Sequence, residues 1–162
     1  MIVVSDTSPI LNLARIGRLE LLQSLYRQVV IPSAVYAELT DARRDLPPAI
    51  DLGSMSWLMV AAASNRDHVE QLLGSLDPGE AEAIVLAIEL RADLFLVDER
   101  RGRRVASASG QAITGLIGVV ARAKQAGLID RAKLVLDELI HTARFWIGPE
   151  LYAEVLAELG EA

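Results

Sequence analysis

Four acidic side chains stand at places in the sequence where strands and helices are expected to meet. Asp6 ends the apolar run 2–4, and Asp98 ends the apolar run 94–97. The carboxyl ends of parallel strands lie along one edge of a sheet, where open α/β sheets bind their ligands. Two glutamates fall early in predicted helices on the same side of the sheet. The spacing therefore predicts a shared site for Asp6, Glu38, Glu80 and Asp98.

Carboxylates gathered in this way would repel one another and raise their own pKa values unless a cation neutralised them. The chain has no cysteine and two histidines, so the available donors are hard oxygens. Such donors favour Mg²⁺ or Mn²⁺. A carboxylate-bound ion of this kind can activate water for attack on a phosphodiester and stabilise the oxyanions that form. The acids thus indicate metal-dependent phosphodiester hydrolysis.

Each acid also has a purely structural interpretation. Asp6 could cap the following helix, and Glu80 is the third residue of a capping pattern opened by Asp77. Glu38 could be a solvated helix residue, and Asp98 could favour a helix N-terminus. The joint placement of four acids at equivalent ends of successive strand–helix units favours the shared site.

Other chemistries fit the sequence poorly. His68 and His141 lie in helical stretches without catalytic neighbours, which argues against a two-histidine ribonuclease or a histidine metal site. Residues 110–115 have the spacing of a phosphate-binding loop, but Leu116 stands where that loop requires lysine. An aspartyl-phosphate phosphatase would need a second Asp at the position of Ser8.

The pattern of apolar runs and turn residues predicts alternating strands and helices. Ser8 is expected to cap a helix that begins at Pro9. A charged loop is expected at 41–48. Strands are predicted at 2–5, 28–31, 57–61, 94–97 and 112–113, and helices at 9–14, 18–25, 34–39, 65–73, 81–92, 100–109, 115–125, 131–143 and 149–159. This alternation predicts a three-layer α/β/α sandwich with a mostly parallel central sheet. We expect one domain, 1–162, with a core at about 1–130 and C-terminal helices at about 131–160.

The composition indicates a globular protein. Hydrophobic residues make up 52% of the 162 residues and charged residues 23%. The start of the chain lacks the features of a signal peptide, and no apolar stretch approaches the roughly 18 residues of a membrane span. The absence of cysteine suits a reducing compartment. These features predict a cytoplasmic protein.

The charge is unevenly distributed. A net charge of −6 argues against a protein whose whole surface binds nucleic acid. Four arginines nevertheless lie within five positions: Arg100, Arg101, Arg103 and Arg104. We expect some of them to bind RNA phosphates and another to pair with a neighbouring acid; the alternative is a solvated basic face.

Several segments resemble the PIN-domain family. The matching pieces are 3–8, 35–38, 77–84 and 96–103, and the segment 114–118 resembles one bacterial and archaeal branch of the family. The resemblance extends from residue 1 to about residue 130. The chain is similar to VapC-like toxin ribonucleases of type II toxin–antitoxin modules. These depend on Mg²⁺ or Mn²⁺, are commonly dimeric, and are held inactive by a cognate antitoxin.

The resemblance implies a role for each acid. Asp6 and Asp98 would bind the ion directly, while Glu38 and Glu80 complete its ligand shell or orient the attacking water. A hydroxyl near the metal would come from Ser8 or Thr7, and Ser8 would position a water. The family usually has Asp at the third acid, where this chain has Glu80 with Glu82 close by, and Thr114 replaces a further acid of some members.

The sequence therefore predicts a Mg²⁺- or Mn²⁺-dependent endoribonuclease, with RNA as substrate and an antitoxin as partner. The alternative is a catalytically weak or inactive PIN-like binding or regulatory module. A mean hydropathy of +0.32 predicts more apolar surface than one small domain buries, and hence a homodimer. The last two helices either help to form the dimer, dock the antitoxin or complete the outer helical layers.

Overall fold

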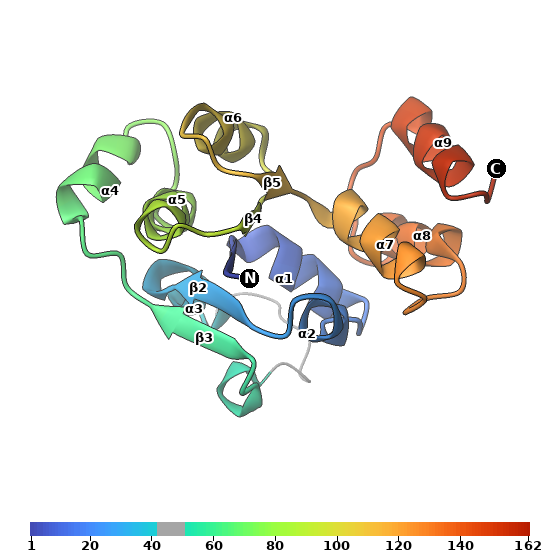
Figure 1. Ribbon diagram of the computed structural model, residues 1–162, viewed down its shortest axis with the longest axis horizontal. Helices are drawn as coiled ribbons and strands as arrows, with labels where there is room; N and C mark the ends of the chain where they lie inside the picture. Colours follow the sequence, from blue (N-terminus) through green and yellow to red (C-terminus); the bar gives the residue numbers. More distant parts are fainter. Residues whose placement is uncertain (42–50) are drawn as a thin grey trace.

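The computed structural model describes residues 1–41 and 51–162 (Figure 1). Within these residues, five parallel strands form one sheet in the order β3-β2-β1-β4-β5. The strands are β1 Val3–Ser5, β2 Val29–Pro32, β3 Leu58–Ala61, β4 Leu94–Leu96 and β5 Ile113–Thr114. The central strands are short apolar runs because helices cover both of their faces. The predicted parallel sheet is confirmed.

Helices on the two faces of the sheet complete a three-layer α/β/α fold, as predicted. The helices are α1 Thr7–Arg15, α2 Glu20–Tyr26, α3 Ser33–Leu39, α4 Arg66–Leu72, α5 Pro78–Glu89, α6 Arg100–Ala108, α7 Leu116–Gln125, α8 Ala132–His141 and α9 Pro149–Glu158. A short 3₁₀ turn, η1 Leu52–Ser54, was not expected from the sequence. The loop expected at 41–48 lies, apart from its first residue, outside the described residues.

Alternation along the strands divides the core into two clusters. Val3 and Leu96 point into the cluster that α1, α2 and α7 cover. Val4 and Phe95 point to the opposite face, against α5 and α6. β1 and β4 are paired with Ser5 opposite Leu96, and the backbone N–H of Asp6 donates to the carbonyl of Leu96 at 3.0 Å. This register fixes which face each strand-end side chain reaches.

The first helix begins earlier than the sequence suggested. α1 starts at Thr7 with Asp6 as its extended N-cap residue, so the expected cap at Ser8 is wrong. Pro9 lies within the first turn, where backbone N–H groups have no partner inside the helix and the missing N–H of proline costs nothing. The earlier start places Thr7 and Ser8 on the helix directly beside Asp6.

The α5 helix follows the predicted capping pattern. Asp77 Oδ1 accepts from the backbone N–H of Glu80 at 2.9 Å, and Pro78 is the first helical residue. Every residue of α5 from Gly79 to Ala87 is buried, as expected for a helix composed largely of Ala, Ile, Val and Leu. This central position brings Glu80 to the end of the sheet.

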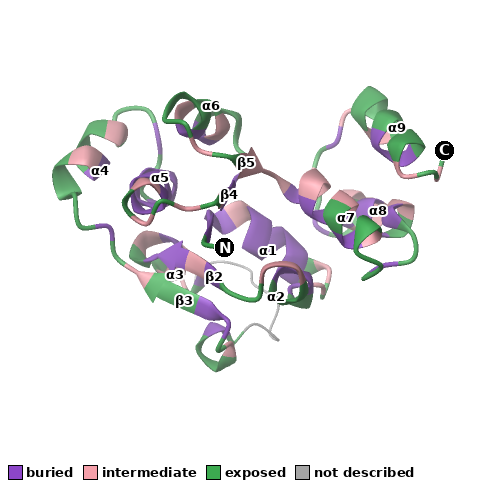
Figure 2. Ribbon diagram, in the orientation of Figure 1, coloured by how far each residue is buried: buried purple, intermediate pink, exposed green. Residues whose placement is uncertain are grey.

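The C-terminal helices pack at one end of the molecule. α8 packs on α7, and α9 contributes buried Val155 and Leu156 to the cluster on that side. Most of the α9 surface is exposed (Figure 2). Among the described helices, none combines the length and the apolar character needed to cross a bilayer.

Candidate active site

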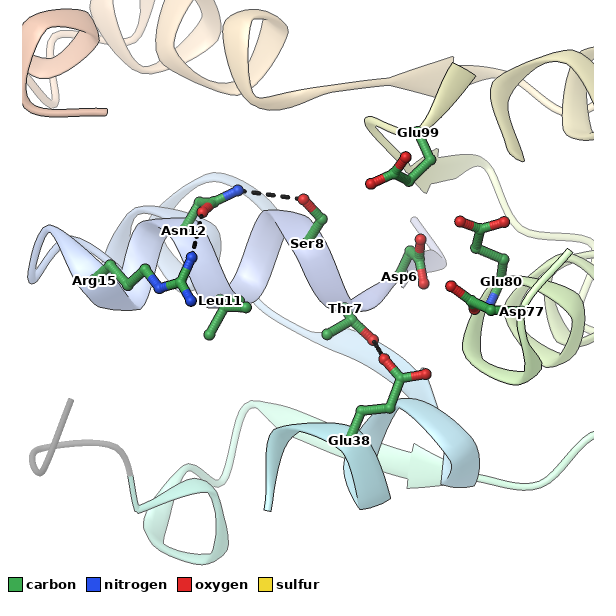
Figure 3. Close-up of a pocket in the computed structure, with 10 residues that line it drawn as sticks. All are labelled: Asp6, Thr7, Ser8, Leu11, Asn12, Arg15, Glu38, Asp77, Glu80 and Glu99. Carbon is green, nitrogen blue, oxygen red and sulfur yellow. Dashed lines mark hydrogen bonds between the residues drawn. The ribbon is translucent and has the colours of Figure 1, made fainter. Parts of the chain in front are cut away.

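A pocket of about 260 Å³ lies at the carboxyl end of β1, where it includes Asp6. Figure 3 shows the side chains that line it. Five acids from four parts of the chain line it: Asp6, Glu38, Asp77, Glu80 and Glu99. Thr7, Ser8, Asn12 and Arg15 contribute the other polar groups, all from α1. The sequence predicted Asp6, Glu38 and Glu80, with the Ser8 or Thr7 hydroxyl, and the structure brings these together.

Asp6 is the most deeply buried acid of the pocket, with 3% of its surface exposed. Its side chain accepts no capping hydrogen bond from α1, so capping does not explain its position. Burial raises its pKa to about 7; the backbone N–H of Thr7 offsets part of the rise, and the negative charges of Glu80, Asp77 and Glu38 add to it. Near neutral pH this carboxyl group therefore binds or releases a proton readily.

Glu80 faces Asp6 from the first turn of α5 (Figure 3). Burial again has the largest effect and raises its pKa to about 7, with further increases from the charges of Asp77 and Glu99. A backbone hydrogen bond at Asp77 offsets only part of this rise in pKa. Burial and neighbouring acids thus disfavour the ionised forms of both Asp6 and Glu80, which is the electrostatic condition that a bound cation relieves.

Glu38 reaches the pocket from α3. Thr7 Oγ1 donates to Glu38 Oε2 at 2.6 Å, which links the start of α1 to α3. Gly79 allows the close approach of α5, because a Cβ at that position would lie 2.6 Å from Glu38 Oε1. A side chain at position 79 would therefore displace the Glu38 carboxylate, a role for this glycine that the capping pattern alone did not explain.

One face of α1 supplies residues that the sequence analysis missed. Asn12 Nδ2 donates to Ser8 Oγ at 3.2 Å, and Arg15 lies one turn further along the pocket. Positions 8, 12 and 15 share a helix face, so the 3.6-residue period could have identified Asn12 and Arg15 once Ser8 was placed. Asp77 was expected only to open the capping pattern of α5 and Glu99 was not singled out, and both line the pocket.

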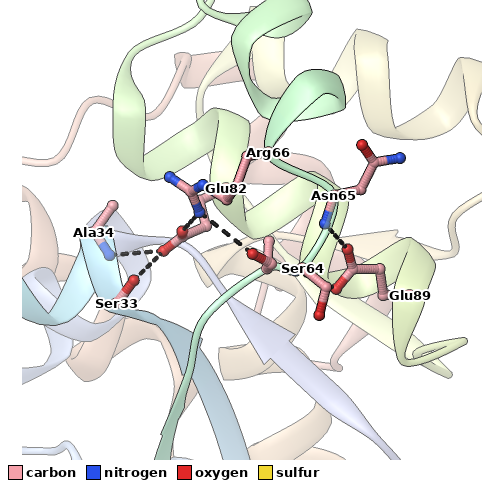
Figure 4. A network of polar contacts seen from close by, with 8 residues as sticks. Ser33, Ala34, Ser64, Asn65, Arg66, Glu82 and Glu89 are labelled. Atoms are coloured by element: carbon pink, nitrogen blue, oxygen red, sulfur yellow. Dashed lines mark hydrogen bonds and ion pairs between the residues drawn. The ribbon is translucent and has the colours of Figure 1, made fainter.

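Glu82 belongs to a different network (Figure 4). Its Oε1 accepts from Ser33 Oγ at 2.7 Å and from the backbone N–H of Ala34 at 2.8 Å, and its Oε2 pairs with Arg66. Burial acts to raise its pKa, but these hydrogen bonds outweigh burial and leave the pKa below its ordinary value. Glu82 thus ties α5 to α3 and α4, and Glu80 is the acid that faces the pocket.

Asp98 does not line the acidic pocket. Its Oδ1 accepts from the backbone N–H of Leu116 at 2.9 Å, at the start of α7, and it lines a neighbouring pocket with Arg103 and Thr114. Burial raises its pKa, while the Leu116 N–H and the Arg103 charge act in the opposite direction. Asp98 Oδ2 is buried and has no hydrogen-bond partner among the described residues.

The four clustered arginines divide between two environments. Arg103 Nη1 donates to the carbonyl of Val97 at 3.0 Å, beside Asp98. Arg100, Arg101 and Arg104 are exposed on α6, and Arg101 Nη1 donates to the carbonyl of Ser75 at 3.3 Å. None of the four lines the acidic pocket, where Arg15 is the basic lining residue.

The donor set fits a divalent cation in its chemistry. Oxygen donors surround the pocket, and the two buried carboxyl groups repel each other's charge. Over residues 1–41 and 51–162, however, no three Asp, Glu or His side chains converge closely enough to hold an ion together. Any ion at Asp6 and Glu80 would therefore need water or substrate oxygens to complete its shell, an arrangement that is common for Mg²⁺.

Comparison with known proteins identifies the family. A family model described as a PIN domain matches residues 2–161, nearly the whole chain. The chain belongs to the PIN-domain family. PIN domains are generally nucleases, and they usually use divalent metals. Neither the curated proteins nor the solved structures gave a match to the chain.

The family match confirms the resemblance inferred from the sequence and extends it through α8 and α9. The closer likeness to VapC-like toxins stays a prediction. The acidic pocket lies at the edge of the PIN-domain sheet where open α/β sheets bind ligands, as expected for a nuclease fold.

Proposed function

We propose that this PIN-domain protein is a metal-dependent endoribonuclease that hydrolyses phosphodiester bonds in RNA. The observation that carries the proposal is the pair of buried carboxyl groups, Asp6 and Glu80, each with its pKa raised to about 7 in the same pocket. Repulsion between buried acids is unfavourable without a counter-charge. Both the pair and the family's chemistry favour a divalent cation.

Asp6 and Glu80 would hold Mg²⁺ or Mn²⁺, with Glu38 and Asp98 as further members of the acidic quartet. Asp98 is included because its Oδ2 is buried and has no hydrogen-bond partner among the described residues. An ion held by these acids would lower the pKa of the attacking water and neutralise charge on the RNA phosphate.

The surrounding side chains would position the substrate and the water. Thr7 holds the Glu38 carboxylate by its hydrogen bond. Ser8 Oγ accepts from Asn12, so its own hydroxyl hydrogen can donate to a water or a phosphate oxygen. Arg15 supplies positive charge at the pocket for a phosphate.

RNA cleavage tests the proposal directly. The native chain should cleave RNA with Mg²⁺ or Mn²⁺ and not in EDTA, and Asp6→Asn should reduce the rate by at least about 100-fold. Glu70→Gln, which removes an exposed acid on α4 remote from the pocket lining, is the matched control and should cleave normally. An Asp6→Asn protein as active as the native chain would contradict the proposal.

A second candidate is a PIN-like module that binds RNA or a protein partner with little or no catalysis. The observation in its favour is that the described acids include no group of three placed to hold a metal. RNA binding without cleavage under every metal condition would support this module over the nuclease.

Within the nuclease proposal, we place the protein in the cytoplasm as the toxin of a toxin–antitoxin module and as a homodimer. The resemblance supports the toxin role, and exposed Leu128 and Leu134, at the end of α7 and on α8, offer apolar surface for association. Growth arrest on expression, relieved by co-expression of the product of an adjacent gene, would support the toxin role. Harmless expression of a protein that cleaves RNA in vitro would count against it.

A further inference from the structure

A second pocket has a volume of about 440 Å³. Consecutive residues link it to the acidic pocket, because Asp98 lines the second pocket and Glu99 lines the acidic one. Its volume falls within the roughly 300–1,000 Å³ that is typical of small-molecule sites. A chain of nucleotides held at the acids therefore has a second recess within reach.

The walls of the second pocket are largely apolar. Ile113 and Ile117 come from β5 and α7, while Phe145 and Leu151 come from the segment before α9 and from α9 itself. Leu151 is 45% exposed, so apolar surface at this pocket faces water. Gly115 also lines the pocket, where a Cβ would collide with Asp98 Oδ1. The recess thus combines an aromatic ring, aliphatic walls and a lining glycine whose close contact with Asp98 leaves no room for a side chain.

The charges of the second pocket balance. It contains one carboxylate, Asp98, and one guanidinium, Arg103, whereas the acidic pocket contains five carboxylates and one guanidinium. A phosphate has no reason to enter a recess without net positive charge. An uncharged planar group with a polar edge fits better, since Arg103 and the Thr114 hydroxyl can hydrogen-bond to such an edge.

We infer that this second pocket binds one unpaired base of the RNA strand, stacked on Phe145, while the neighbouring phosphate lies at the acids. The inference rests on the proposed nuclease function and makes Phe145 a specificity-determining residue. Unpaired bases are typically recognised by stacking on aromatic side chains with hydrogen bonds to their edges. The pocket would therefore select single-stranded RNA, because a paired base cannot leave its helix to enter.

Binding of short oligonucleotides tests this inference. Each protein carries Asp6→Asn so that the RNA survives titration in Mg²⁺, and binding of an unstructured RNA pentamer is compared with a pentamer that is abasic throughout. Phe145→Leu removes the aromatic ring and keeps an apolar side chain for the fold. Trp146→Leu is the matched control, since Trp146 is the adjacent aromatic residue, is 82% exposed and does not line the pocket.

The parent and the Trp146→Leu protein should bind the intact pentamer roughly 5- to 100-fold more tightly than the abasic one, the range expected for one stacked base. Phe145→Leu should lose most of this preference while its affinity for the abasic pentamer stays the same. The inference would be overturned if Phe145→Leu kept the full preference for the intact pentamer, or if the parent protein showed no such preference. RNA cleavage by the protein with native Asp6 would show that the nuclease function still holds in that case.

Discussion

At the scale of single residues, the ionised carboxylates that would bind a cation also reduce the free energy of unfolding. Asp6 and Glu80 both have pKa values raised to about 7. A carboxyl group whose pKa is higher in the folded than in the unfolded state binds more protons when folded. The free energy of unfolding therefore falls as pH rises from about 4 to about 7. The ionised site is a cost that a bound cation would offset.

Asp6→Asn should consequently stabilise the metal-free protein at pH 8. A rise in the pKa of Asp6 from 3.8 to about 7 corresponds to at most roughly 4 kcal/mol, and we expect a gain of about 1–2 kcal/mol because relaxation of the folded protein reduces the cost. The gain should shrink as pH falls toward 4, where the folded protein carries this carboxyl group in its protonated form. Thermal unfolding in EDTA across this range measures it, and an equal difference at every pH would contradict the assigned cause.

Glu82 should behave in the opposite way. It is 1% exposed and bonded to Ser33, Ala34 and Arg66, so Glu82→Gln should destabilise the protein by about 1.5–3 kcal/mol. Because its pKa lies below the ordinary 4.5, this contribution is present above pH 4.5 and is lost as pH falls below that value. Urea unfolding at pH 7 and pH 4 tests both statements. Glu80→Gln is the matched comparison, and a loss of stability as large as that of Glu82→Gln would contradict the distinction between the two acids.

At the scale of elements, the register of β1 and β4 explains where the sequence analysis succeeded and where it fell short. Apolar runs and capping residues identified the strands and α5, because those signals are local. The placement of Asp98 depends on pairing. Ser5 lies opposite Leu96, so Asp6 continues on the α5 side with Val97, and the next residue, Asp98, points toward α7. Asp98 lies one residue beyond the position that pairs with Asp6, so its side chain faces the opposite side of the sheet.

Asp98 should therefore show two separable roles. Asp98→Ala should destabilise the protein by about 1 kcal/mol through loss of the hydrogen bond to the Leu116 N–H, the size expected when a helix cap is removed. Asp98→Asn keeps an acceptor oxygen and should retain most of the stability while losing RNA cleavage. Chemical denaturation and cleavage assays on both variants separate the roles. An active Asp98→Asn protein would remove Asp98 from the catalytic proposal.

Arg100 and Arg101 lie in the first turn of α6, and Arg104 lies in its second turn. Positive charge in the first turn is unfavourable beside the helix dipole, by about 0.3–1 kcal/mol for each residue. Arg100 and Arg104 are exposed, and no hydrogen bond of either side chain to another described residue accounts for its position, which favours a role in binding. Replacing both with Ala should leave stability unchanged or slightly higher. RNA binding should weaken, and the slope of log affinity against log salt should fall by about one for each phosphate that the variant no longer neutralises. An unchanged slope would show that the RNA phosphates bind elsewhere on the surface.

At the scale of the whole molecule, the exposed apolar side chains are unevenly placed. Leu128, Leu134, Trp146 and Leu151 lie on or between α7, α8 and α9, where the fold provides no further layer of described residues to cover them. Met59 and Val60 are exposed on β3, at the opposite edge of the sheet (Figure 1). The sequence predicted excess apolar surface from composition alone. Only the fold shows that four of the nine large apolar side chains exposed among the described residues collect at the C-terminal end.

The part of this surface at the end of α7 and on α8, with Leu128 and Leu134, predicts where the homodimer forms. We expect light scattering to report a dimer at micromolar concentration, and Leu134→Glu to convert it to a monomer, because Leu134 on α8 is 52% exposed and a charge there would need to be desolvated on association. Met59→Glu on β3 is the control, with a similar exposure of 48%, and should remain dimeric. Neither change touches the core, so Met59→Glu should unfold near the native temperature, and Leu134→Glu should lose only the stability that association adds. A monomer after Met59→Glu and a dimer after Leu134→Glu would move the interface to the β3 edge. A native chain that is monomeric would leave the C-terminal surface for a different protein, and antitoxin binding should then be sensitive to Leu134→Glu.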